Sequence, residues 1–351
     1  MAPTDEQSMT PDPHRPVSAE RIAPRSNARC ALSFDVEDWF HAGNLRIPPG
    51  HWAEMPSRIE RSMETILSLL EEYDTIATFF VLGWIAHRHP SLVRRIRRGG
   101  HEIASHGFWH QPLSHMTRKT FVEDVRRAQV AIESAADTTP IGFRAPSYSI
   151  DERTSWAFDG LRELGFRYDS SVYPVRAPHG RYGWPNSPLR PHRVRTDLWE
   201  FPLPTLTLWG RRVPAASGAY FRIAPCAVTT MAIEQNLNRG ISVVVNIHPW
   251  ELDPDQPRVR TSIGRRLLHY TNLRTTRNKL EHVLRRYEFV TIRQMLNAIE
   301  KGGILARGLM PKTQVLGRSG EPIQRRAGEK LKNIVKERGA GPPINRPLHP
   351  R

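Results

Sequence analysis

The chain of 351 residues is long enough for one large α/β barrel or for two ordinary domains. Hydrophobic residues make up 39% of the chain and charged residues 25%, which excludes a fibrous or wholly disordered protein. The formal net charge of +16 suits an anionic partner. Half of this excess lies in Arg307–Arg351, with eleven Lys or Arg and three Glu, so the charge gives little support to a nucleic-acid-binding face.

The composition also limits the compartment and the partners. Cys30 and Cys226 are too few for a disulfide scaffold or a cysteine zinc site. Residues 1–29 lack the apolar stretch of a secretory signal peptide, and no window holds the roughly 18 apolar residues of a transmembrane helix. We therefore expect a cytoplasmic or inner-membrane-associated protein. Its basic end lacks a nucleic-acid recognition motif, so we expect no nucleic-acid partner and name a membrane surface as the alternative contact.

Three segments of different composition divide the chain. Residues 1–28 are rich in proline and lack apolar periodicity, which predicts a disordered leader. Residues 29–305 carry the apolar patterns of a barrel domain with its own C-terminal elements. Residues 306–351 are basic and rich in Pro and Gly, which predicts a flexible tail with one short helical pattern at Gly328–Glu337.

Within the middle segment, short apolar runs alternate with helical patterns. The predicted strands begin at Cys30, where the chain reads CALSFDVEDWF, and continue with Thr75–Gly83, His101–His106, Ile141–Phe143, Arg167–Ser170, Ile241–Trp250 and Phe289–Thr291. The predicted helices are Arg58–Tyr73, Pro90–Arg98, Thr117–Ala135, Thr154–Leu164, Ala227–Asn238, Thr276–Tyr287 and Ile292–Lys301. Pro174–Pro204 is predicted to be irregular. Repeated βα units favour parallel strands with helices outside, as an α/β barrel or an open doubly wound sheet.

Polar residues cluster at the ends of several predicted strands, which is where an α/β barrel builds its active site. The segments are Asp35–Asp38, Ser105–His110, Arg144–Ser147, Asp169–Ser171 and His248–Trp250. The shared placement predicts one common site.

His106 and His110 are the strongest metal-ligand candidates. A pair of histidines four residues apart arises readily by chance among fifteen, and a structural pair is the ordinary alternative. Gly107 favours a turn at a strand end, where both imidazoles can converge on one ion. His101 and His115 flank the pair at a less suitable spacing. Two imidazoles and one carboxylate, with water in the remaining position, are typical of a catalytic metal site.

The carboxylate can come from the first strand. Side-chain alternation puts Asp35 and Glu37 on one side of the sheet and Val36 and Asp38 on the other. Two acidic groups at a buried strand end repel each other unless a cation or a proton lies between them, which favours a metal nearby. Solvated carboxylates in a loop are the alternative interpretation.

Two further residues stand at strand ends. Arg144 can pair with Asp35 and hold it ionised, although a lone arginine is more often a surface residue. His248 ends the apolar run ISVVVNI. A catalytic histidine and a hydrogen-bonded structural histidine are equal alternatives for this position.

The order and spacing of these segments resemble the five motifs of the carbohydrate esterase family 4 deacetylases, also called the nodulation-type chitooligosaccharide deacetylase domain. The resemblance covers residues 30–300. The stretches SFDVEDWFH, SHGFWHQPL, FRAPSYSI, YDSSVYP and HPWELDPDQPR are most similar to polysaccharide deacetylases associated with exosortase and exopolysaccharide gene clusters. The resemblance implies a distorted (β/α)7 barrel and a divalent cation, usually zinc, with cobalt, nickel or manganese as substitutes.

The same resemblance implies roles for the residues. Asp35 is expected to be the general base, and His106 and His110 are expected to be metal ligands. Glu37 is expected to be the third ligand. Many relatives have adjacent aspartates at this motif, so Asp38 is the alternative.

The remaining roles concern the acid and the substrate. His248 is expected to protonate the departing sugar amine, and Arg144 is expected to orient the base. Asp169 is expected either to hydrogen bond to His248 or to have a structural role. The residues expected to contact substrate, through backbone amides or ring stacking, are Pro146, Tyr148 and Trp250.

The resemblance thus implies a hydrolase acting on carbon–nitrogen bonds other than peptide bonds. The expected reaction is removal of N-acetyl groups from amino sugars of an exopolysaccharide or its precursor, such as a lipid-linked oligosaccharide. The alternatives are a related amidohydrolase that opens a cyclic amide and a glycan-binding barrel without turnover. Ala216–Arg222 and Asn246 depart from the usual pattern of relatives and are expected to reshape the substrate groove.

Overall fold

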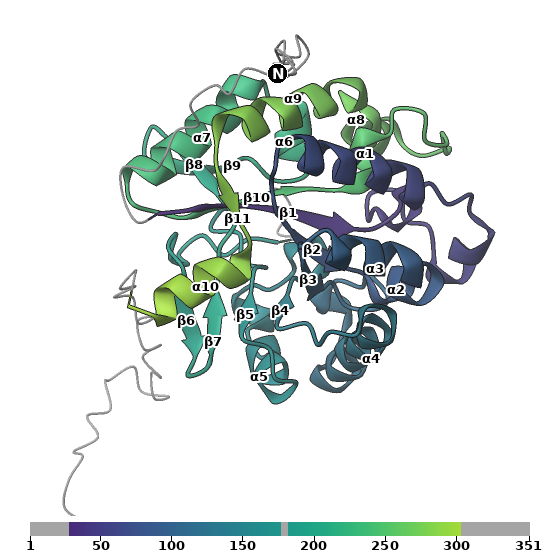
Figure 1. Ribbon diagram of the computed structural model, residues 1–351, viewed down its shortest axis with the longest axis horizontal. Coiled ribbons are helices and arrows are strands. Elements are labelled where there is room, and N and C mark those ends of the chain that lie inside the picture. Colours follow the sequence, from purple (N-terminus) through teal and green to yellow (C-terminus); the bar gives the residue numbers. More distant parts are fainter. Residues whose placement is uncertain (1–27, 177–181, 303–351) are drawn as a thin grey trace, which may run out of the picture. The chain divides into compact units, whose positions relative to one another are not determined.

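A computed structural model of the protein describes residues 28–176 and 182–302 (Figure 1). The predicted leader and the predicted basic tail, with its helical pattern at Gly328–Glu337, lie outside the described residues. No helix within the described ranges combines the length and the apolar character needed to cross a bilayer.

In the described part of the chain, nine strands form one sheet, in the order β10-β1-β2-β3-β4-β5-β7-β6, and β11 pairs with the start of β1. The strands are β1 (Cys30–Val36), β2 (Thr78–Val81), β3 (Glu102–Ser105), β4 (Gly142–Phe143), β5 (Tyr168–Asp169), β6 (His192–Arg195), β7 (Leu198–Glu200), β10 (Val243–Ile247) and β11 (Phe289–Val290). The path from β10 to β7 is parallel throughout, and β6 is antiparallel to β7. This curled parallel sheet confirms the predicted distorted α/β barrel, which is open between β10 and β6 in the described residues.

Helices pack against this sheet, most of them on its outer side. They are α1 (Ile59–Glu72), α2 (Gly83–Arg88), α3 (Pro90–Arg98), α4 (Arg118–Ala136), α5 (Ala157–Glu163), α6 (Ala219–Ile223), α7 (Cys226–Asn238), α8 (Ile263–Tyr270), α9 (Leu273–Arg286) and α10 (Ile292–Glu300). Figure 1 shows α1, α7 and α9 above the β10–β1 part of the sheet, and α2 to α5 beside the strands from β2 to β5. Each βα unit therefore returns the chain to the same end of the sheet, so the carboxyl ends of the strands gather there.

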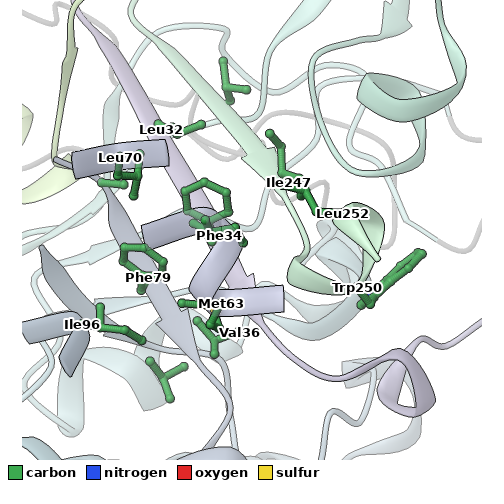
Figure 2. Packing of buried hydrophobic residues seen from close by; sticks show 14 of the residues in the cluster. Leu32, Phe34, Val36, Met63, Leu70, Phe79, Ile96, Ile247, Trp250 and Leu252 are labelled. Atoms are coloured by element: carbon green, nitrogen blue, oxygen red, sulfur yellow. The ribbon is translucent and has the colours of Figure 1, made fainter. Parts of the chain in front are cut away.

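Alternation along β1 separates the apolar core from the polar interior. The outward set packs against α1 in the main apolar cluster and consists of Leu32, Phe34 and Val36 (Figure 2). Full burial of each such side chain stabilises the fold by about 1.5–3 kcal/mol. Ser33 and Asp35 lie on the other side of the strand, where both are buried and hydrogen-bonded to polar side chains.

The inner side of the sheet also carries an apolar cluster, against which α10 packs. Its buried members are Ala31, Phe80, Ala104, Tyr168, Phe201 and Val244. The interior is thus a packed core, and it places the polar groups of Ser33 and Asp35 toward the carboxyl end, as in other α/β barrels.

The sequence-based element predictions were wrong in several places. Pro174–Pro204, predicted to be irregular, contains β6 and β7, because β7 pairs with β5, which is distant in sequence. The predicted strand Thr75–Gly83 is shortened to β2, and α2 begins at Gly83. The hairpin of β8 (Thr205–Leu208) and β9 (Arg211–Pro214) and the helix α8 were not predicted.

Candidate active site

Side chains from the ends of four strands converge at the carboxyl end of the sheet. Glu37 follows β1, His106 and His110 follow β3, Arg144 follows β4, and His248 follows β10. These segments are far apart in sequence, and the parallel sheet alone brings them together.

Glu37, His106 and His110 form a cluster that fits a divalent cation. Their candidate ligand atoms all lie within 4.8 Å of one another. His110 Nε2 lies 2.7 Å from Glu37 Oε2, yet this buried oxygen has no hydrogen-bond partner among the described residues. His106 Nδ1 lies 2.9 Å from the carbonyl oxygen of Arg144, so Nδ1 carries the proton and Nε2 is left with a free lone pair. An orphaned carboxylate oxygen beside two imidazoles is a donor set suited to zinc.

The protonation states agree with metal binding. Burial lowers the pKa of His106 to about 4, which leaves the imidazole neutral near pH 7. Burial acts to raise the pKa of Glu37, but the neighbouring His110 outweighs it and holds this pKa well below its usual range. Both groups are therefore in the form that coordinates a cation.

A tight turn after β3 presents the two histidines. Gly107 has a φ of +70°, and a Cβ there would lie 2.9 Å from an Asp124 carboxylate oxygen. The Asp124 carboxylate accepts the backbone N–H groups of Phe108 and Trp109 at 2.8 and 3.1 Å. Glycine allows the close approach, and Asp124 then fixes the turn that ends at His110.

Asp38, the alternative third ligand, has a different environment. Its carboxylate accepts the Ser57 hydroxyl at 2.7 Å and the backbone N–H groups of Trp39 and Arg58 at 2.8 Å each. These bonds hold the segment before α1 and use both carboxylate oxygens. The geometry therefore favours Glu37 over Asp38, as the alternation of β1 requires.

Arg144 is fully buried and binds Asp35 directly. Its Nη1 donates to Asp35 Oδ1 at 2.8 Å, to Ser33 at 2.8 Å and to Asn246 at 2.6 Å. Its other nitrogens donate to the carbonyl and hydroxyl oxygens of Ser170 at 2.8 and 2.9 Å. Every side of the guanidinium is thus held by protein atoms, which fixes the position of the Asp35 carboxylate.

The surroundings of Asp35 keep its carboxylate ionised. Burial acts to raise the pKa, but Arg144 and the imidazoles of His106 and His248 outweigh it and lower the pKa of Asp35. Asp35 Oδ2 accepts the Asn246 amide at 3.0 Å and lies 3.6 Å from His248 Nε2. A fixed anionic carboxylate at this place can accept a proton from water.

His248 lies close to both Asp35 and Glu37. Its Nε2 lies 3.6 Å from Asp35 and 3.7 Å from Glu37, and its Nδ1 lies 2.9 Å from Glu251. Glu251 is itself paired with buried Arg222 at 3.0 Å. Burial acts to lower the pKa of His248, but hydrogen bonding to Glu251 outweighs it and raises the pKa to about 9. His248 can therefore hold a proton at the site near neutral pH.

Comparisons with known proteins match two parts of the chain. The sequence pattern of the polysaccharide deacetylase family matches residues 49–168, and a domain of unknown function (DUF3473) matches residues 170–297. The chitooligosaccharide deacetylase of Sinorhizobium fredii is 36% identical over 107 residues, covering 30% of this chain and 50% of that protein. Residues 49–168 match the polysaccharide deacetylase domain. The match confirms the family resemblance for the motifs within it, which are those of His106, His110 and Arg144.

Two further comparisons agree. The chitooligosaccharide deacetylase of Rhizobium leguminosarum bv. trifolii is 39% identical over 106 residues, covering 30% of this chain and 49% of that protein. The chain thus spans about half the length of the curated relatives it matches. A solved structure from Mycobacterium smegmatis, assigned by name to the polysaccharide deacetylases, has a TM-score of 0.54 at 22% identity and covers 84% of this chain and 98% of that chain, which shows the same fold.

Asp169 lies beside the site but does not fit the expected hydrogen bond to His248. Its carboxylate accepts the hydroxyl and the backbone N–H of Ser171 at 2.6 and 3.1 Å. Burial raises the pKa of Asp169 and, together with the neighbouring Asp169, raises the pKa of Glu200 on β7 well above its usual range. The imidazole of His248 pairs instead with Glu251, which lies three residues later in the same turn.

Trp250 also differs from the expected sugar-stacking role. It is 6% exposed, and its indole N–H donates to Glu37 Oε1 at 3.0 Å. Its ring stacks on His248 and His269 at centroid distances of 5.4 and 4.4 Å. Trp250 therefore positions a metal-ligand candidate and leaves little ring surface for a sugar.

The turn containing Pro146 and Tyr148 lies over the inner polar network. Pro146 is buried, and the Tyr148 hydroxyl lies 2.7 Å from both the Ser217 hydroxyl and the Asn246 amide. Ser147 and Tyr148 have positive φ values of 57° and 52°. Such backbone strain is characteristic of functional sites, and this turn is the candidate wall of the substrate groove.

Several polar residues that hold the site were not predicted from the sequence. They are Ser33, Asp124, Glu200 and Glu251. Ser170 and Arg222 lie in stretches singled out from the sequence, but their contacts with Arg144 and Glu251 were not predicted. A signal existed for Glu251, which follows His248 at a spacing that a single turn can close. Asn246 had been noted as unusual, and it proves to bridge Asp35 and Tyr148.

Proposed function

We propose that the protein is a metal-dependent deacetylase that hydrolyses N-acetyl groups on amino sugars of an exopolysaccharide or its precursor. The observation that carries this proposal is the placement of ionised Asp35, fixed by Arg144, opposite protonated His248 and beside a cluster suited to a cation. A base, an acid and a Lewis-acid site at the same end of the sheet are the groups that amide hydrolysis requires.

Glu37, His106 and His110 would hold the cation. When bound, a divalent ion such as zinc, cobalt, nickel or manganese would polarise the acetyl carbonyl and lower the pKa of the attacking water. Three protein ligands are the number that catalytic zinc sites use, with the remaining position taken by water or substrate.

Asp35 and His248 would move the two protons of the reaction. Asp35 takes a proton from water as the water oxygen bonds to the acetyl carbon. His248 then gives its Nε2 proton to the sugar nitrogen as the carbon–nitrogen bond breaks, which yields acetate and a free amine. Glu251 holds the His248 ring in the orientation that this transfer needs.

The names of the relatives and the motif resemblance support an acetylated glycan as the substrate. Within this proposal, the glycan is an exopolysaccharide intermediate, free or lipid-linked, and the protein acts in the cytoplasm or at the inner membrane. The basic segment after Arg307 would contribute a membrane-surface contact through its charge.

Acetate release tests the proposal. The purified full chain is incubated with N-acetylated chitooligosaccharides and with each of the four metals in turn. We expect metal-dependent acetate release that falls by at least about 100-fold in Asp35→Asn and in His106→Ala. His115→Ala is the matched control, because His115 follows the same turn but lies outside the cluster. Metal binding without acetate release from any glycan would instead support the glycan-binding barrel, or the cyclic-amide reaction if such amides are cleaved.

A further inference from the structure

Helix α8 carries three large apolar side chains that stay largely or partly exposed in the described structure. Ile263 is 79% exposed, Leu267 is 61% exposed and Leu268 is 42% exposed. Ile263 and Leu267 are four residues apart and therefore lie on the same face of the helix. Packing inside the domain does not account for Ile263 and Leu267, since most of their surface stays exposed. We call Ile263, Leu267 and Leu268 the α8 ridge.

The segment around the α8 ridge is strongly basic. Between Asp255 and Glu281 the sequence has no acidic residue. Its basic residues are Arg258, Arg260, Arg265, Arg266, Arg274, Arg277 and Lys279. Arg277 pairs with Glu281 at 2.9 Å, whereas the other five arginines form no ion pair with any described residue. An exposed apolar ridge with unpaired arginines around it has the composition of an interfacial helix.

The opposite face of α8 is fixed to the domain next to the candidate active site. His269 is fully buried and stacks on Trp250, the residue that donates to Glu37. The carbonyl oxygen of Leu268 accepts a hydrogen bond from Arg222 at 2.6 Å. These contacts hold the helix so that the α8 ridge points outward, and Figure 1 shows α8 at the outer margin of the helices near α1 and α9.

We propose that α8 binds an anionic membrane surface, with Ile263 and Leu267 entering the headgroup region and the neighbouring arginines on lipid phosphates. Charge complementarity selects this partner, because each arginine near an anionic bilayer strengthens binding. Nucleic acid would use the arginines but gives the central apolar side chains no partner. A second copy of the chain would place two basic surfaces against each other.

This surface is distinct from the basic segment after Arg307 and does not depend on the proposed reaction. It also lies on the helix that supports Trp250, so membrane contact would bring the candidate site close to the lipid headgroups. A lipid-linked glycan is the kind of substrate that such a position favours.

Vesicle cosedimentation of the full chain tests the inference. The probes are vesicles of phosphatidylcholine, with and without phosphatidylglycerol. We expect binding only with phosphatidylglycerol, weakening as salt is raised. The double variant Ile263→Ser, Leu267→Ser should reduce the partition coefficient by about tenfold or more, because it removes the inserted apolar surface. Arg266→Gln should reduce it by about fivefold.

Two control variants match these changes elsewhere on the surface. Val130→Ser replaces an apolar residue of α4 that is 61% exposed, the same fraction as Leu267. Arg98→Gln removes an exposed, unpaired charge from α3 in the described structure. Both should bind vesicles like the wild type, and all variants should keep the wild-type melting temperature because the replaced side chains are exposed.

Three results would overturn the inference. The first is absence of binding to phosphatidylglycerol vesicles. The second is unchanged binding by the Ile263→Ser, Leu267→Ser variant, which would assign the contact to another basic segment. The third is tighter, ridge-independent binding to duplex DNA, which would identify the arginines as a nucleic-acid surface. None of these readouts uses acetate release, so the result is independent of the proposed function.

Discussion

The Glu251 carboxylate binds His248 at two points. One Glu251 oxygen accepts the backbone N–H of His248 at 3.0 Å and lies 2.9 Å from Nδ1 of the same residue. The turn that follows β10 therefore closes on its own histidine and leaves only Nε2 directed at Asp35. Buried Arg222 pairs with the other Glu251 oxygen. Glu251 is therefore held between His248 and Arg222 inside the protein.

Glu251→Gln is expected to move the alkaline limb of the activity profile to lower pH. The negative charge of Glu251 raises the pKa of His248 to about 9, and an acid acts only while protonated. Without that charge, His248 loses its proton at a lower pH and activity falls earlier as the pH rises. The measurement is kcat against pH for acetate release. The control is Glu234→Gln, which alters the exposed ion pair with Arg286 and should leave the alkaline limb in place. An alkaline limb that does not move in Glu251→Gln would show that His248 is not the acid.

Glu37→Gln and Asp38→Asn are expected to have different effects, the first on zinc affinity and the second on thermal stability. Glu37→Gln weakens zinc affinity by at least about tenfold, because it removes the charge of a ligand candidate. Asp38→Asn keeps the zinc affinity and lowers the melting temperature, because Asp38 holds the start of α1. Metal analysis after dialysis and melting curves with and without added zinc measure both effects. The opposite pattern would make Asp38 the ligand.

Arg144→Ala is expected to destabilise the fold by about 3–5 kcal/mol, because it leaves the buried Asp35 carboxylate without its partner. Urea unfolding measures the change. Arg167→Ala breaks an ion pair with Glu300 that is 47% and 31% exposed, and it should cost less than about 1 kcal/mol. Similar losses of unfolding free energy in the two variants would show that the buried Arg144–Asp35 pair stabilises the fold no more than a surface ion pair does.

Glu200→Gln is expected to become more stable relative to the wild type as pH rises. The pKa of Glu200 is raised well above its usual range by burial and by Asp169. A raised carboxyl pKa gives a stabilising contribution that is complete below the unfolded-state pKa and is lost as pH rises through the folded-state pKa. Glutamine cannot ionise and keeps a donor toward Asp169. Melting temperatures from acidic to alkaline buffer measure the difference, and a difference independent of pH would mean that Glu200 is already ionised.

Much of the site was predictable because each motif has a strong local pattern. Apolar runs ending in Asp35, His106 and His248 indicated strand ends, and the alternation of β1 favoured Glu37 over Asp38. The partner of His248 was not predictable in the same way. A glutamate three residues later and an aspartate on another strand, Glu251 and Asp169, are both chemically suited to it.

Some strands and helices could not be predicted from local sequence patterns either. The segment that forms β6 and β7 has weak patterns of its own, and β7 becomes a strand because β5 offers it a pairing edge. Helix α8 was missed because its apolar residues face outward, so it lacks the buried stripe by which a helix is found in sequence.

The sequence by itself determined the alternating strand and helix pattern, the polar strand ends and the family, because these follow from short-range periodicity and from motif order. The tertiary structure decided which titratable and charged side chains lie next to each other: Arg144 with Asp35, Glu251 with His248, and Glu200 with Asp169. The physical reason is that hydrogen bonds and ion pairs act over a few ångströms, while the residues of these three pairs lie up to 109 positions apart in the chain.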